Sequence, residues 1–282
     1  MRPRLALFLF TLPLFALPLC AQQQMPPQYV IGVDLAQPKQ GCPVFVRRVD
    51  PQGPAAKAGV KPGDAVVTID GVPIESLADM QKVTRDKPRR VRIEVARAGG
   101  KYAYDVEREP LADQLERQGR KVAPNGAQVP ADMSDAEIDR IRNFDPARVK
   151  DVVFPNGLPE DPATYFGGFQ VMLVQMPEEV MVGPMDDGPA THAGVHLGDI
   201  IVAVNGTEVK GLTAAQLMPL FTSAKPGRMR LRVRRLEVER VFEFPLWKTS
   251  DILAVNQLQV VRGQIVPAGV AEKDLPCFLQ QP

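Results

Sequence analysis

Few residues of this sequence combine the type and the spacing that metal binding requires. The only two histidines, His192 and His196, lie four positions apart, a spacing at which one helix face could present both imidazoles to a metal ion. They flank Ala193-Gly194, where glycine is expected to end a short helix, and no cysteine or carboxylate cluster accompanies them. We therefore predict no metal site and no cofactor.

The serines lack the sequence contexts of hydrolase nucleophiles. The chain contains four of them, Ser76, Ser134, Ser223 and Ser250. None stands in a Gly-x-Ser-x-Gly elbow, and a His-Glu-x-x-His motif is absent. The sequence predicts that the protein is not an enzyme.

The N-terminus predicts export from the cytoplasm. A basic start is followed by an apolar run over residues 5–19 and a small-residue exit, which is typical of a secretory signal peptide over residues 1–21, cleaved after Ala21. In the alternative, a lipoprotein, Cys20 would be the acylated first residue, but Leu19 replaces the small residue usual before it. No other apolar stretch is long enough to span a membrane. We expect a periplasmic or secreted protein.

Two cysteines remain after such a cleavage, Cys42 and Cys277. An even pair in an oxidising compartment can form a disulfide, which here would tie the C-terminal tail to the start of the chain. The alternative is that both thiols are reduced.

The composition of the chain is that of a folded protein, because 45% of its residues are apolar and can form a buried core. Its net charge of +1 argues against nucleic acid as a partner.

A long internal repeat organises the chain. Residues 53–71 recur 135 positions later as residues 188–206, with ten of nineteen paired positions identical. A repeat with this period indicates two copies of a whole domain.

Each copy predicts the same order of elements. Gly-Pro-Ala opens a short helix that ends at Ala-Gly, and a Gly-Asp turn leads into an apolar strand. Asp70-Gly71 and Asn205-Gly206 are typical hairpin turns. The predicted strands are 65–69, 90–97, 200–204 and 228–235, and the predicted longer helices are 77–84 and 213–223.

This arrangement resembles bacterial PDZ domains. The first copy, over residues 28–109, is more similar to those of trypsin-like envelope proteases, and the second, over 165–247, to those of carboxyl-terminal processing proteases. The resemblance implies an α+β fold with two partly open β-barrels or sandwiches, each with a short and a longer helix. A protease domain of either type would need a long additional segment, and we expect none.

The resemblance also implies where peptides bind. In the family, a peptide C-terminus adds as a strand to the sheet edge, and backbone amides of a loop hold its carboxylate. The matching loop residues are Tyr29, Val30, Ile31, Gly32 and Val33 in the first copy and Tyr165, Phe166, Gly167, Gly168 and Phe169 in the second. Met80, Val83, Leu217 and Leu220 are the predicted helix walls, which favour an apolar terminal residue, although helix-spaced apolar residues are also ordinary core. Pro219 is expected to kink or shorten the second groove helix.

The remaining segments predict a helical spacer over residues 110–164 and a tail over 248–282. Helices are expected over 111–119 and 134–149, the second opened by a capping box of Ser134 and Glu137. The spacer either docks on the domains or covers a groove and regulates it. Residues 253–266 alternate as a strand or hairpin would.

The arginines at positions 228, 230, 232 and 234 fall on one face of the predicted strand 228–235. We interpret this face as solvated, with an anionic partner as the alternative.

These observations predict a non-catalytic extracytoplasmic adaptor that captures C-terminal or extended segments of envelope proteins by strand addition. Two alternatives stay open. The protein could be an accessory regulator of a separate envelope protease, or a structural spacer whose grooves are filled by its own linker and tail.

Overall fold

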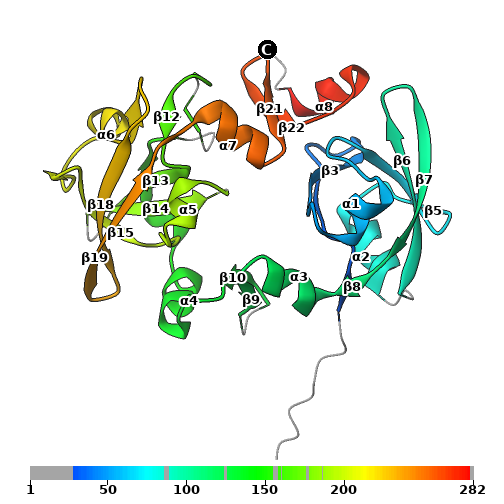
Figure 1. Cartoon of the computed structure of the whole chain (residues 1–282), viewed down its shortest axis with the longest axis horizontal. Helices are drawn as coiled ribbons and strands as arrows, with labels where there is room; N and C mark the ends of the chain where they lie inside the picture. The colour runs from blue at the N-terminus through cyan, green and yellow to red at the C-terminus, as the bar shows by residue number, and fades with distance from the viewer. Residues whose placement is uncertain are drawn as a thin grey trace, which may run out of the picture.

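The computed structural model describes residues 28–85, 89–123, 126–154, 158–159, 161–175, 178–185 and 187–279. The predicted signal peptide, including Cys20, lies outside these residues. Figure 1 shows two domains at opposite ends of the long axis, connected by one segment along the bottom and another along the top. The α+β class is confirmed, and no sheet in the described part of the chain closes into a barrel.

The first domain is a six-stranded sheet with two helices. The sheet has the order β2-β3-β4-β6-β7, with β5 added beside β4. Its strands are β2 (Val33–Ala36), β3 (Val44–Val49), β4 (Ala65–Ile69), β5 (Val72–Pro73), β6 (Arg90–Arg97) and β7 (Gly100–Glu107). The helices are α1 (Pro54–Ala58) and α2 (Leu77–Arg85), and β1 (Tyr29–Val30) pairs with β8 (Glu109–Pro110) at the domain's base.

The second domain repeats this plan with one strand more. Its sheet has the order β11-β13-β14-β15-β18-β19, with β16 beside β15. The strands are β11 (Val149–Val152), β13 (Phe169–Val174), β14 (Glu179–Met185), β15 (Ile200–Val204), β16 (Thr207–Glu208), β18 (Arg228–Arg235) and β19 (Val238–Pro245). The helices are α5 (Pro189–His192) and α6 (Ala214–Phe221), and β12 (Tyr165–Phe166) lies between β17 (Thr222–Ser223) and β20 (Trp247–Lys248).

The repeated residues make the same contacts in both domains. Asp70 and Asn205 adopt positive φ in their hairpin turns, and each side chain accepts a hydrogen bond from the backbone of the strand opposite. The aspartate of each Gly-Asp turn is buried and paired with an arginine, Asp64 with Arg97 at 2.6 Å and Asp199 with Arg235 at 2.7 Å. These aspartates therefore do more than form the predicted turn, since they join the turn to the end of the long strand.

Each domain is followed by a helix, a hairpin and a second helical turn. The spacer contains α3 (Leu111–Arg117), β9 (Arg120–Val122), β10 (Gln128–Pro130), α4 (Asp135–Arg142) and the 3-10 turn η1 (Pro146–Arg148). The tail contains α7 (Thr249–Val255), β21 (Leu258–Val261), β22 (Gln264–Pro267), the 3-10 turn η2 (Glu272–Asp274) and α8 (Leu275–Phe278). Figure 1 shows that each segment starts on its own domain and ends on the other, α4 beside the second and α8 beside the first.

Two predictions for these segments were wrong in part. The helix expected over 134–149 ends at Arg142, because Pro146 disfavours helical backbone just before it, and the β-branched residues that follow form β11. In the tail, residues 258–267 form the expected hairpin, but residues 253–255 belong to α7, whose Leu253 is buried.

The tail is joined to the first domain by a disulfide and by packing. Cys42 and Cys277 are bonded, with their Cα atoms 5.9 Å apart. Phe278 packs on Phe45, at 4.8 Å between ring centroids. The side chain of Gln257 accepts from the amide and donates to the carbonyl of Val49, at 2.8 and 2.7 Å. The predicted disulfide therefore closes a contact that non-covalent interactions also hold.

On the arginine-bearing face of β18, residues 228 and 230 are exposed and residues 232 and 234 half-buried, while the residues on its other face, at 229, 231 and 233, are buried. Three of its arginines pair with carboxylates of neighbouring strands, for example Arg234 with Glu179 at 2.6 Å. None of the helices in the described residues has the length and apolarity that a bilayer span needs.

Candidate peptide-binding grooves

The first domain has a hollow where the groove is predicted. Its volume is about 360 Å³, and it lies between the loop at residues 29–33, strand β2 and helix α2. All five predicted loop residues line it, and so does Met80 of α2. Val83 packs against the domain core instead of lining the hollow. The floor is apolar and consists of Leu35, Ile69, Val91 and Ile93.

The loop is held by its carbonyls. Gly32 has a φ of 76°, a left-handed conformation that glycine adopts without strain. The carbonyls of Ile31 and Gly32 accept hydrogen bonds from the amides of Ala55 and Asp50, at 2.9 and 2.8 Å. Strand β2 pairs with β3 on one side and has no partner strand on its other side among the described residues. This edge can accept an added strand that ends at the loop.

The spacer supplies a third wall to this hollow. Gln114 and Gln118 from α3 and its cap, and Arg120 and Gln128 from the hairpin β9-β10, line it beside Arg48 and Arg108. The guanidinium of Arg108, which is 8% exposed, donates to the carbonyl of Tyr29. Nε of Arg48 donates to Asp34 of β2 at 2.9 Å. The groove is thus bounded by three arginines as well as by apolar side chains.

Strand β11 of the spacer occupies the corresponding edge in the second domain. It pairs antiparallel with β13, the counterpart of β2, from Val149 opposite Val174 to Val152 opposite Met172. The amide of Val153 then donates to the carbonyl of Val171 at 2.9 Å, which extends the pairing toward the loop at residues 165–169. The spacer therefore binds in the direction expected of a peptide ligand, by strand addition.

Apolar side chains of this internal segment fill the second groove. Val153, Phe154 and Leu158 are 2%, 3% and 7% exposed and belong to the main core of the second domain. The Phe154 ring meets that of Phe166 edge to face, at 4.6 Å between centroids. Phe154 thus lies where the last side chain of a bound peptide would enter.

The predicted residues of the second groove surround this segment. Phe166, Phe169 and Leu217 are buried in the same cluster, with Leu220 packed against it. Gly167 and Gly168 are buried and Tyr165 is partly exposed. Helix α6 ends at Phe221, two residues after Pro219 and before the expected end at Ser223, in agreement with the predicted shortening.

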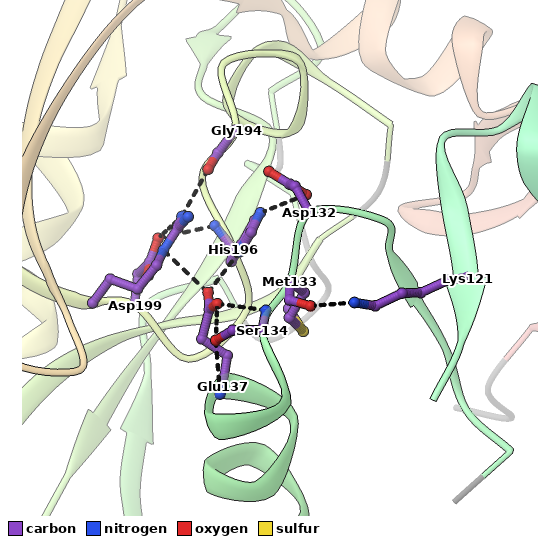
Figure 2. Close-up of polar contacts among 9 residues, drawn as sticks. Lys121, Asp132, Met133, Ser134, Glu137, Gly194, His196 and Asp199 are labelled. Atoms are coloured by element: carbon purple, nitrogen blue, oxygen red, sulfur yellow. Dashed lines mark hydrogen bonds and ion pairs between the residues drawn. The ribbon is translucent and has the colours of Figure 1, made fainter. Parts of the chain in front are cut away.

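A polar cluster, buried except for Asp132, holds the spacer on the second domain just before β11 (Figure 2). His196 is 3% exposed, and its two ring nitrogens lie 2.9 Å from Glu137 of α4 and 3.2 Å from Asp132. Glu137 also lies 3.3 Å from Arg235, which the domain's own Asp199 holds. His192 lies elsewhere, 2.7 Å from Asp187, so the two histidines do not share a site.

Glu137 is ionised in this cluster. Burial by itself would raise the pKa of its carboxyl group, but hydrogen bonds from the hydroxyl and amide of Ser134 and from His196 lower the pKa to about 2. The predicted capping box is present, with the Ser134 amide donating to Glu137 at 2.8 Å. The same carboxylate therefore caps α4 and docks it.

The sequence left a groove filled by the protein's own linker open as an alternative, but it did not identify the segment that fills the second groove, and the arginine wall of the first groove was missed. A signal for that segment was present, since Val149, Val152 and Val153 are β-branched and precede a Pro-Asn-Gly turn. Arg108 and Arg120 carried no local signal, because their position beside the groove depends on how the spacer folds back on the first domain.

The chain matches known proteins in the repeated regions. The PDZ domain family matches residues 45–97 and 180–235. Over 61 residues the chain is 43% identical to the magnetosome formation protease MamE of Magnetospirillum gryphiswaldense. The matched stretch covers 21% of this chain and 8% of that protease. It thus spans only a small part of that relative.

Among solved structures, the HtrA3 PDZ domain bound to a phage-derived ligand is 20% identical and covers 29% of this chain and 85% of that one, with a TM-score of 0.26. The HtrA-type protease AlgW with a decapeptide is 27% identical and covers 30% of each chain, with a TM-score of 0.26. The two family matches fall on the two repeated sheets described above. The chain therefore contains two PDZ domains.

Proposed function

We propose that this protein is a non-catalytic extracytoplasmic adaptor whose first PDZ domain captures the C-terminus of a partner peptide by strand addition. The observation that carries the proposal is the contrast at the ligand edge. Strand β13 already pairs with β11, whereas β2 has no second partner strand among the described residues and lies beside a hollow with an apolar floor and a left-handed glycine loop. Peptide binding is what PDZ domains do in general, and the basic, apolar N-terminal segment supports export.

The second domain has a structural role in this proposal. Its groove holds residues of the spacer that are buried as core, so it fixes the spacer and, through it, the third wall of the first groove. This corresponds to the self-occupied spacer hypothesis for one groove out of two. The proposed partner is a protein of the cell envelope with a free, apolar C-terminus. An envelope protease that the adaptor would regulate is one such partner.

The test uses full-length protein and synthetic decapeptides ending in Val, measured by fluorescence anisotropy. A peptide with a free carboxylate should bind with a Kd of about 1 μM, as expected for one short added strand. The same peptide amidated at its C-terminus should not bind, because the loop amides then lose their anion. Equal binding of the two forms would contradict C-terminal capture. Hydrolysis of casein that persists through purification would contradict the non-catalytic part.

A further inference from the structure

The two grooves differ in charge at equivalent positions. Arg108 directly precedes β8, which pairs with the carboxylate loop strand β1, and Leu246 directly precedes β20, which pairs with β12 in the same way. Arg120 opens β9 of the first hairpin, and Leu258 opens β21 of the second. Leu246 and Leu258 belong to or pack against the core that includes Phe154 and Leu158. In the second domain, the residues at these positions and the internal ligand are thus all apolar and share one core.

Few carboxylates line the first groove beside Arg120. Asp34 is the one carboxylate among the residues that line the hollow, and it already pairs with Arg48. Nη2 of Arg120 donates to the carbonyl of Gln128 at 2.6 Å, while its Nε is buried with no hydrogen-bond partner among the described residues. Burial lowers the pKa of Arg120 and the charge of Arg48 lowers it further, while the charge of Asp34 offsets only part of the shift. An anion in the groove would relieve both effects.

We propose that the first groove selects peptides with an acidic residue next to an apolar C-terminal residue, and that Arg120 is the residue that reads the acidic side chain. This proposal rests on the proposed function, because it names the ligand class of that same groove. It follows from the comparison with the second domain, where Leu246 and Leu258 share one apolar core with Phe154 and Leu158. By the same logic an arginine wall suits a ligand with negative charge.

The position of the acidic residue follows from strand geometry. Successive side chains of an added strand point to opposite sides. If the terminal side chain enters the hollow between Met80 and the floor residues Ile69 and Ile93, the preceding one points away from that floor. The arginines contributed by β3 and β9 line the hollow outside that floor.

The experiment compares decapeptides that differ only at the residue before a C-terminal Val, which is Asp, Asn or Lys. Full-length protein should bind the Asp peptide about tenfold more tightly than the Asn peptide, with the Lys peptide weakest, because ion pairs in a desolvated site discriminate by charge. The preference should shrink as salt is raised. Arg120→Gln should reduce the Asp-over-Asn ratio to about twofold or less, and Arg120→Lys should retain most of it.

The matched control is Arg230→Gln, on the exposed face of β18 in the second domain, which should leave the tenfold ratio unchanged. Circular dichroism would check that each variant is folded, and the comparison of peptides on the unaltered protein needs no variant. If Asp and Asn peptides bind equally while amidation still abolishes binding, the acidic preference is refuted and the proposed function stands. If no free C-terminus binds, both are refuted.

Discussion

The two PDZ domains of this chain share an order of elements but differ at the edge where ligands add. The edge strand β13 pairs with β11, and the side chains that follow β11 are buried as core. The equivalent strand β2 has no second partner among the described residues, and arginines border its groove. An apolar groove can be filled permanently by an apolar segment of its own chain, which stabilises the fold. In a groove bordered by arginines, the same segment would cover the guanidinium groups without offering them hydrogen-bond acceptors, which costs free energy. In the proposed function, the charge of the wall thus distinguishes the binding domain from the structural one.

The connections to the two domains differ as well. The tail reaches the first domain through the Cys42–Cys277 disulfide, and the spacer reaches the second through the ionic cluster around His196. The first contact depends on the redox state and the second on pH. Each connection can therefore be weakened without touching the other.

The largest effect is expected from the disulfide. Replacing both Cys42 and Cys277 by Ser should lower the free energy of unfolding by up to about 5 kcal/mol in the chain-entropy model, since the bond closes a loop across most of the chain. Urea unfolding with and without a reducing agent measures this, and reduction should have no effect on the double variant. A loss below about 1 kcal/mol would mean that the packing of Phe278 and Gln257 holds the tail by itself.

Removing the internal ligand should cost nearly as much. Phe154→Ala should destabilise the second domain by about 3–5 kcal/mol, as for other buried phenylalanines. Trp247, the one tryptophan, lies in β20 of that domain and reports its unfolding by fluorescence. The control Val255→Ala, at a side chain 44% exposed, should change stability by less than about 0.5 kcal/mol. A loss as small as the control's would show that the segment is not part of the core.

Local patterns were enough to predict each domain but not how the chain uses the groove of the second. The strands at 65–69, 90–97, 200–204 and 228–235 form with the expected bounds, because alternation and turn residues determine them locally. The pairing of β11 with β13 depends on a spacer that runs from the first domain to the second and contacts the second through Glu137. Such non-local pairing leaves only a β-branched run in the sequence, which the preceding helical pattern obscured.

A smaller loss of stability is expected from substitutions of glycines with positive φ in the first domain, and two such substitutions distinguish backbone strain from loss of peptide binding. Gly32→Val should abolish peptide binding and cost about 1–2 kcal/mol of stability, since φ is positive and an added Cβ would meet Asp50 Cβ at 3.2 Å. Gly71→Val is the matched control, because Gly71 has a φ of 78° with no atom within 4 Å of an added Cβ. It should show similar strain and retain binding. If both variants bind peptide equally well, the loop at residues 29–33 does not hold the carboxylate.

The last effect concerns the pH dependence of the second domain. The pKa of Glu137 is lowered from 4.5 to about 2 in the folded protein, so the unfolded state takes up a proton first as pH falls. The stabilisation from this group is complete above about pH 4.5 and disappears progressively toward pH 2. Its carboxylate faces Ser134, His196 and Arg235, and the disulfide at the other end of the molecule does not titrate in this range. Acid should therefore loosen the spacer on the second domain before the tail on the first.

The measurement is urea unfolding followed by Trp247 fluorescence at several values between pH 7 and pH 2.5. Glu137→Gln should lower stability at pH 7 and flatten the curve below about pH 4.5, because the group that takes up the proton is gone. Glu116→Gln, at an exposed position of α3, should follow the unaltered protein throughout. Parallel curves for Glu137→Gln and the unaltered protein would show that other carboxylates cause the acid sensitivity. In that case, pH would not control the attachment of the spacer to the second domain through Glu137, and only the redox dependence of the tail's disulfide would remain as a difference between the two connections.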